Sequence, residues 1–114
     1  MKYVIAIIQP HKLEDVRDAL IELDIEALTV TEVRRFGSSE EHMEFYRAAE
    51  YKVGFLPKTK IEFAVSAELA DRAVEVLRDA ATTGSVGDGR IYMLELAKTV
   101  QIRTGKVDAE VAAL

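Results

Sequence analysis

The sequence predicts one α+β domain in which an antiparallel sheet carries two helices on one face. Three observations lead to this prediction. The chain has 114 residues, which is enough for one compact core and too few for two. Its apolar residues change along the chain between strand-like alternation and helix-like spacing. The order of the predicted elements divides into two similar halves, with a long loop between them.

The first half is a strand, a helix and a second strand. Residues 2–8 (KYVIAII) are mostly β-branched or apolar and stop just before Pro10, which indicates a strand. Helical spacing of three and four residues then follows at Leu13, Val16, Leu20 and Leu23. Residues 28–36 (LTVTEVRRF) are rich in threonine and valine and predict the second strand.

The second half repeats this order after a long loop. Residues 37–54 have no clear period, so we expect a mobile loop over about 37–55. Residues 58–65 (KTKIEFAV) predict a third strand, and Ser66 is a suitable N-cap for a second helix. The apolar positions of that helix are Leu69, Ala73, Val74, Leu77 and Ala80 or Ala81.

A final strand over 90–97 (RIYMLELA) follows the glycine-containing turn at 84–89, and a tail covers about 99–114. The order βαββαβ is that of the split βαβ, ferredoxin-like fold, here as one domain over 1–114. Two helices can cover only one face of its sheet. The first strand is nevertheless apolar on both faces, so we expect the uncovered face to associate with other copies of the chain.

The composition excludes several classes of function. The net charge of −5 argues against nucleic acid or an anionic membrane surface as a partner. The absence of cysteine excludes disulfides, thiol nucleophiles and cysteine-bound metals. The apolar run at 3–8 lacks a following cleavage site, and no stretch approaches the ~20 apolar residues that cross a bilayer. We therefore expect a cytoplasmic protein.

The segment TTGSVGDGR (82–90) is the main candidate for chemistry. Glycines at 84, 87 and 89 allow backbone N–H groups to converge on an anion, and Arg90 adds a forked cation. The alternative is a helix end with Gly84 at C′, followed by a turn at Asp88-Gly89. A second candidate is the basic set Lys58, Arg90, Arg103 and Lys106, which could surround a triphosphate or be solvated separately.

Several motifs, in order and spacing, resemble the nitrogen-regulatory PII signal-transduction family. They are MKYVIAIIQPHKLEDVRDAL at the start, YRAAEY (46–51), FLPKTKIE (55–62), TGSVGDGRIY (83–92) and IRTG (102–105). The resemblance implies a homotrimer that binds ATP or ADP, with Mg²⁺ as a candidate companion, in sites between subunits. It also implies a regulated protein partner, such as a membrane transporter, and no catalysis.

The resemblance also implies roles for individual residues. Phosphate contacts would come from Gly87, Asp88, Gly89 and Arg90, with Arg103 from the neighbouring subunit. Gly37 would close the base of the loop, and Thr29 and Glu62 would meet the adenosine. Lys58 matches the residue that pairs with a carboxylate of 2-oxoglutarate, and Tyr51 matches the loop tyrosine that is uridylylated in some members.

The chain departs from the family pattern near these positions. Ser38 and Ser39 stand where relatives carry arginine and glutamine, Arg35 replaces a glycine, and Gln101 replaces an arginine. Without the glutamine that helps to hold Mg²⁺, we expect weak or absent 2-oxoglutarate binding, with Lys58 offering one exposed charge pair. We also expect ATP to lose its usual advantage over ADP. The loop tip, with Glu40-Glu41 and Met43, suggests a different partner from that of relatives.

The sequence also bears on three other classes of function. An enzyme would need paired carboxylates or a histidine base beside the glycine turn, and the sequence has none there. A divalent-metal response is the alternative suggested by Glu40, Glu41, His42 and Glu44, although a solvated acidic loop explains them as well. RNA binding would need exposed aromatic residues in basic surroundings.

Overall fold

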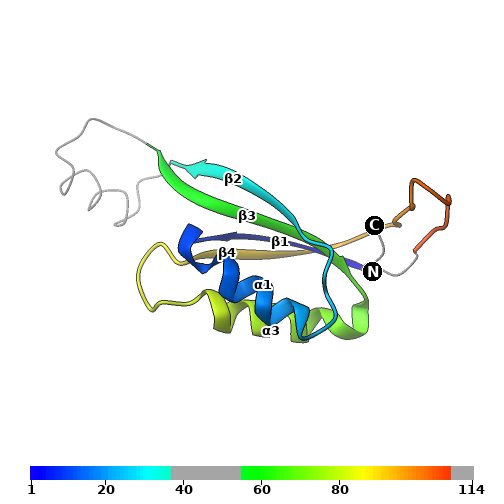
Figure 1. Cartoon of the computed structure of the whole chain (residues 1–114), viewed down its shortest axis with the longest axis horizontal. Helices are drawn as coiled ribbons and strands as arrows, with labels where there is room; N and C mark the ends of the chain where they lie inside the picture. Colours follow the sequence, from blue (N-terminus) through cyan, green and yellow to red (C-terminus); the bar gives the residue numbers. More distant parts are fainter. Residues whose placement is uncertain (37–54, 109–114) are drawn as a thin grey trace.

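The computed structural model describes residues 1–36 and 55–108. Its elements are β1 (Lys2–Ile8), η1 (Pro10–Lys12), α1 (Leu13–Ile21), β2 (Thr29–Arg35), β3 (Leu56–Val65), α3 (Ala67–Ala81) and β4 (Gly89–Glu95). The strands form one antiparallel sheet in the order β2-β3-β1-β4. Both helices lie on the same side of this sheet (Figure 1). The predicted α+β, ferredoxin-like fold is confirmed.

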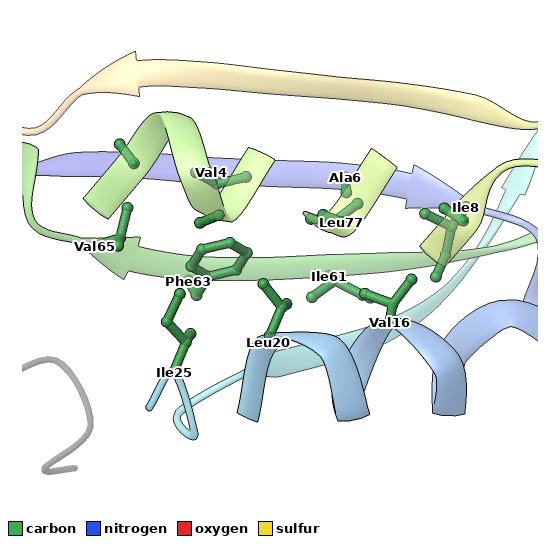
Figure 2. Packing of buried hydrophobic residues seen from close by; sticks show 13 residues of the cluster. Val4, Ala6, Ile8, Val16, Leu20, Ile25, Ile61, Phe63, Val65 and Leu77 are labelled. Carbon is green, nitrogen blue, oxygen red and sulfur yellow. The ribbon is translucent and has the colours of Figure 1, made fainter. Parts of the chain in front are cut away.

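The core lies between the sheet and the two helices. Alternate residues of β1, Val4, Ala6 and Ile8, face the helices and are buried. They meet Ile61 and Phe63 of β3 and residues of both helices, as Figure 2 shows. The helical contribution comes from Val16, Leu20, Ala70, Ala73, Leu77 and Ala81. Burial of these side chains is the main force that fixes the sheet against the helices.

The opposite face of the sheet has no described element over it. The other residues of β1, Tyr3, Ile5 and Ile7, lie on this open face and are only partly buried. Their neighbours on β4, Tyr92 and Leu94, are 48% and 47% exposed. An apolar strip in the middle of an uncovered sheet is expected to meet another protein surface.

Element boundaries differ slightly from the sequence expectation. β3 begins at Leu56, two residues earlier than predicted, and the described β4 runs from Gly89 only to Glu95. Ser66 occupies the N-cap of α3 in an extended conformation, but its hydroxyl makes no capping hydrogen bond. The short η1 was not predicted; it follows from Pro10, whose fixed φ suits a first helical position.

The described part of the tail forms a small hairpin. Val100 and Val107 make an isolated antiparallel bridge, and the Gln101 N–H donates to the carbonyl of Lys106 at 2.8 Å. This hairpin lies at the opposite end of β4 from the turn at 84–89 (Figure 1). The predicted loop at 37–55 falls almost wholly outside the described residues, as do Gly37 and Tyr51. Within 1–36 and 55–108, no helix has the length and apolar character needed to span a membrane.

Candidate anion-binding site

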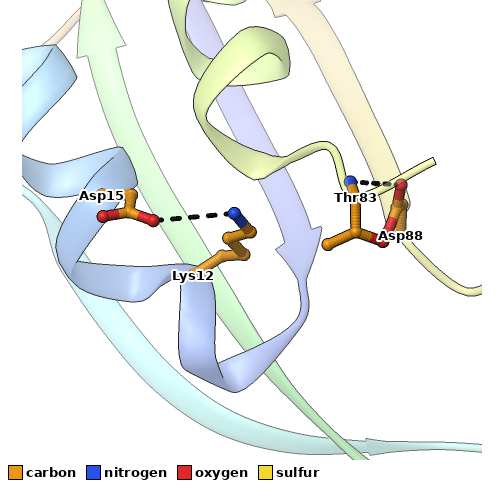
Figure 3. A network of polar contacts seen from close by, with 4 residues as sticks. All are labelled: Lys12, Asp15, Thr83 and Asp88. Carbon is orange, nitrogen blue, oxygen red and sulfur yellow. Dashed lines mark hydrogen bonds and ion pairs between the residues drawn. The ribbon is translucent and has the colours of Figure 1, made fainter. Parts of the chain in front are cut away.

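The turn between α3 and β4 is organised around Asp88. One carboxylate oxygen accepts the backbone N–H groups of Thr83 and Gly84 at 2.8 and 2.9 Å. The other accepts the Thr83 hydroxyl, and Figure 3 shows Thr83 and Asp88 facing each other across the turn. These bonds fold the segment back on itself, so the Asp88 carboxylate stabilises the turn from within.

The same bonds lower the pKa of Asp88. The Thr83 hydroxyl is the largest cause, followed by the Thr83 backbone N–H and, more weakly, the Gly84 N–H. The carboxylate is therefore held ionised while its oxygens are engaged inside the turn. Asp88 also borders the cavity described below, although its carboxylate is engaged by the turn. Its place beside phosphates stays a prediction.

The helix end differs from the alternative considered from the sequence. α3 ends at Ala81, and Thr82 already has an extended backbone with φ −74° and ψ 138°. Gly84 is therefore not the C′ residue, and that expectation is wrong. The helix is closed instead by the Thr82 N–H, which donates to the carbonyl of Arg78 at 3.1 Å.

Gly87 and Gly89 both need the freedom of glycine. Their φ angles are +96° and +110°, a region that other residues rarely adopt. At Gly89 a Cβ atom would lie 1.8 Å from the carbonyl oxygen of Ile7, because β4 starts in direct contact with the end of β1. The turn therefore brings main chain, without side chains, to the edge of the site.

Lys58 supports this turn from β3. Its ammonium donates to the carbonyl of Gly87 at 2.8 Å and to Oε1 of Gln9 at 3.3 Å. The residue is only 2% exposed. The sequence expectation of an exposed charge pair is thus wrong, because alternation along β3 turns Lys58 under the turn rather than into solvent. Lys58 holds Gly87 in place and so links β3 to the candidate site.

A cavity of about 670 Å³ lies beside the turn on the open face of the sheet. Its cationic lining comes from Arg34 and Arg35 at the end of β2 and from Arg90 at the start of β4. The remaining lining is Ile7, Val33, Phe36, Ser85, Gly87, Asp88, Gly89 and Tyr92. This volume is in the usual range for small-molecule sites.

Arg34 and Arg35 were not assigned to the site from the sequence. Two adjacent arginines at the end of a predicted strand were the available signal, since strand ends and turns tend to gather at one edge of a sheet. Antiparallel pairing does this here, because the ends of β1 and β2 meet the starts of β3 and β4.

The other predicted residues lie away from this cavity within one chain. Thr29 and Glu62 are opposite one another in the β2–β3 pair. Tyr3 donates to Glu62 at 3.2 Å, and burial, then the charge of Glu62, raises the pKa of Tyr3. Arg103 is exposed in the tail hairpin at the far end of β4. The structure thus brings together Gly87, Asp88, Gly89 and Arg90, and does not bring Thr29, Glu62 or Arg103 to them.

The described residues that line the cavity do not form a protein cage for a metal ion. Among them, Asp88 is the only acidic one, and its oxygens accept hydrogen bonds from the turn. Among the residues that the structure describes, no three potential ligands of His, Cys, Asp or Glu type gather in one place. Mg²⁺ bound here would depend mainly on oxygens of the ligand, as is usual for Mg²⁺ with phosphates.

Comparison with known proteins agrees with this fold and arrangement. The family model described as nitrogen regulatory protein P-II matches residues 1–106. Nitrogen regulatory protein P-II of Rhizobium etli is 53% identical over 110 residues, covering 96% of this chain and 98% of that protein. Nitrogen regulatory protein GlnK of Escherichia coli K12 is 50% identical over 108 residues, covering 95% of this chain and 96% of its own length.

A solved structure shows the same architecture. The crystal structure of Arabidopsis thaliana PII bound to citrate superposes with a TM-score of 0.76 at 27% identity, covering 93% of this chain and 83% of that one. The family match extends over nearly the whole chain, and the relatives match over nearly their whole length. The chain therefore belongs to the nitrogen regulatory protein P-II family and is a signal-transduction protein of nitrogen regulation.

Proposed function

We propose that this protein senses adenine nucleotides, ATP or ADP, by binding their phosphates in the cavity beside the Gly87–Arg90 turn. One observation carries the proposal: three arginines from two separate strands, β2 and β4, border one cavity next to a glycine turn. The turn contributes backbone donors and Arg90 a forked cation, a combination suited to phosphate oxygens. A polyphosphate is the ligand class that uses all of these groups.

The site is proposed to lie between subunits. P-II proteins are trimers that regulate partner proteins. Within one chain Thr29, Glu62 and Arg103 are too far along the sheet to join the cavity, and the residues of β4 alone separate Arg90 from the tail by about 20 Å. A neighbouring subunit packed on the open face would supply equivalents of these residues. This placement supports the role proposed for Arg103 as a phosphate ligand from the neighbour.

The remaining parts of the proposal concern the readout. The segment joining β2 to β3 leaves the sheet directly beside the cavity, at Phe36 and Phe55, whose rings are 5.3 Å apart. Nucleotide occupancy would be passed through this segment to a protein partner in the cytoplasm, without catalysis. Gly37 at its base, Tyr51 as a modified residue and a membrane transporter as partner remain part of the proposal.

Calorimetric titration of ATP and ADP tests the nucleotide site. Arg90→Ala should weaken binding by about 1.5–3 kcal/mol, the scale of a charge-assisted contact. Arg17→Ala is the matched control, because it removes the same charge outside the cavity. Arg17 lies on α1, where it pairs with Asp18. Equal affinities in wild type and Arg90→Ala would contradict the site, and absence of binding by the wild type would contradict the function.

We also propose that 2-oxoglutarate binds weakly or not at all. Lys58, its expected partner, is buried and already donates to Gly87 and Gln9, so pairing with a carboxylate would require these bonds to be shared or broken. Titration of 2-oxoglutarate into protein saturated with Mg-ATP should give no heat beyond dilution at micromolar concentrations. Clear micromolar binding would show that Lys58 turns toward the ligand.

A further inference from the structure

The end of β2 presents one arginine to the same face as Arg90. Arg35 is opposite Leu56 in the β2–β3 pair, and alternation places it on the open face with Val33. Arg90 is opposite Ile7 on that same face. Arg34, between Val33 and Arg35, alternates to the other side of the strand. Of the two arginines on β2, Arg35 is therefore the one that shares the open face with Arg90, and both line the cavity.

The charges around the cavity are unbalanced. Arg34, Arg35 and Arg90 border it, and among the described residues none of the three forms an ion pair. The single carboxylate in the lining, Asp88, accepts hydrogen bonds from Thr83 and Gly84. The cations thus remain available for an anionic ligand, and guanidinium groups are suited to phosphate oxygens.

Arg35 and Arg90 enter from opposite edges of the sheet. Their strands are the outer ones in the order β2-β3-β1-β4, so three strand spacings, about 14 Å, separate the two backbones across the sheet. Strand pairing puts Arg90 level with Thr31 of β2, so Arg35 also lies four residues, about 13 Å, further along that strand. The two arginine side chains shorten this diagonal gap but do not close it. A ligand that contacts both must be elongated and must carry negative charge at both ends of its anionic part.

We infer that Arg35 is a specificity-determining residue of this chain, which favours the triphosphate of ATP over the diphosphate of ADP. The inference rests on the proposed function, because it assigns a role within the same site. Gly87–Arg90 holds the phosphates common to both nucleotides, and Arg35 contacts the additional terminal phosphate from the β2 side. Arg35 thereby replaces the cation that the loop lacks at Ser38, and ATP keeps an advantage that the sequence alone led us to deny.

Calorimetry with ATP and ADP in parallel tests this role. Arg35→Gln should lower the affinity for ATP about tenfold and that for ADP less than about threefold, because one charge-assisted contact is lost only with ATP. The affinity of Arg35→Lys for ATP should lie between those of the wild type and Arg35→Gln, because lysine keeps the charge but lacks the forked donor geometry of the guanidinium. Arg17→Gln, with the same change of charge on α1, should alter neither affinity.

Ionic strength gives a second measurement that needs no variant. The ratio of ATP to ADP affinity in the wild type should fall as salt rises from 0.05 to 0.5 M, roughly as the Debye length shortens, because Arg35 is exposed. The inference would be overturned by a ratio that does not depend on salt. It would also be overturned if Arg35→Gln weakened the binding of both nucleotides equally, or the binding of neither. Either result would leave the nucleotide site itself in place. No binding of either nucleotide to the wild type would instead overturn the proposed function.

Discussion

At the scale of single residues, Gly89 is the most constrained position of the site. Replacing it with alanine would put a Cβ atom 1.8 Å from the Ile7 carbonyl oxygen at a φ of +110°. Both contacting groups are main chain of the sheet, so neither can rotate away. We expect Gly89→Ala to cost about 2–4 kcal/mol of stability, from backbone strain plus overpacking, as measured by chemical denaturation.

Gly84 provides the control for this prediction. Its φ is also positive, at +84°, but a Cβ atom there would meet nothing within 4 Å. Gly84→Ala should therefore cost only the backbone strain, about 1 kcal/mol. Equal losses in the two variants would mean that the contact with Ile7 does not determine the requirement for glycine at 89.

Asp88 makes the turn sensitive to acid. Its pKa is lowered in the folded protein, so its contribution to stability is present above the ordinary value of about 3.9 and is lost as pH falls through the lowered pKa. At pH 7, Asp88→Asn should lose about 0.5–1 kcal/mol, the scale of a lost capping carboxylate at an exposed site. Once the pH is below this lowered pKa, the wild type and the variant should converge in stability.

Hydrogen exchange at Thr83 and Gly84 measures this effect locally. These are the backbone N–H groups that donate to Asp88, so their protection should fall in Asp88→Asn at pH 7. Hydrogen exchange at the start of α1, where the Lys12–Asp15 ion pair lies apart from the turn (Figure 3), should be the same in both proteins. Unchanged protection at Thr83 and Gly84 would show that the carboxylate does not brace the turn.

Residue roles were the least predictable part of the site. The glycine turn and Arg90 stand out in the sequence because closely spaced glycines let backbone N–H groups converge on an anion beside a forked cation. The burial of Lys58 could not be predicted, since strand alternation places it on the open face, where it donates to the turn at Gly87 and to Gln9. The contribution of Arg35 depends on strand pairing that joins residues far apart in the chain.

At the scale of elements, periodicity was a reliable guide where one face is buried. β1 has the predicted bounds because it is one of the two inner strands and is apolar from Tyr3 to Ile8. For α3 the buried positions are Ala70, Ala73, Leu77 and Ala81, whereas Leu69 and Val74 pack only at the margin of the core. Small residues face the sheet because the helix lies close to it, which hydrophobicity alone does not reveal.

The ends of elements were less predictable for a physical reason. β3 extends back to Leu56 because pairing with Arg35 of β2 continues there, although the sequence PK at 57–58 interrupts the alternation. Pro57 can occupy this place near the start of a strand, where a missing N–H is tolerated. Hydrogen bonds to a partner strand thus decide boundaries that local propensity leaves open.

At the scale of the whole molecule, the open face of the sheet is the surface through which we expect subunits to meet. Tyr3, Ile5 and Ile7 lie along the middle of this face, with Tyr92 and Leu94 beside them on β4. The family is trimeric, and an apolar strip of this kind is the surface that symmetric association would bury. Burial of the remaining exposed half of Leu94 would contribute about 0.7–1.5 kcal/mol per subunit.

Leu94→Glu should therefore convert the trimer into smaller species while leaving each chain folded. A carboxylate in an apolar contact would lose its hydration without a partner, a cost large enough to separate the subunits. Light scattering should give three times the chain mass for wild type and a lower mass for the variant, with unchanged circular dichroism.

Ile21→Glu is the matched control, because Ile21 is 42% exposed on α1, close to the 47% of Leu94, but lies on the helical side. If Leu94→Glu remained trimeric, or if Ile21→Glu dissociated equally, the subunits would associate through another face, and the proposed interfacial nucleotide site would have to be relocated with it.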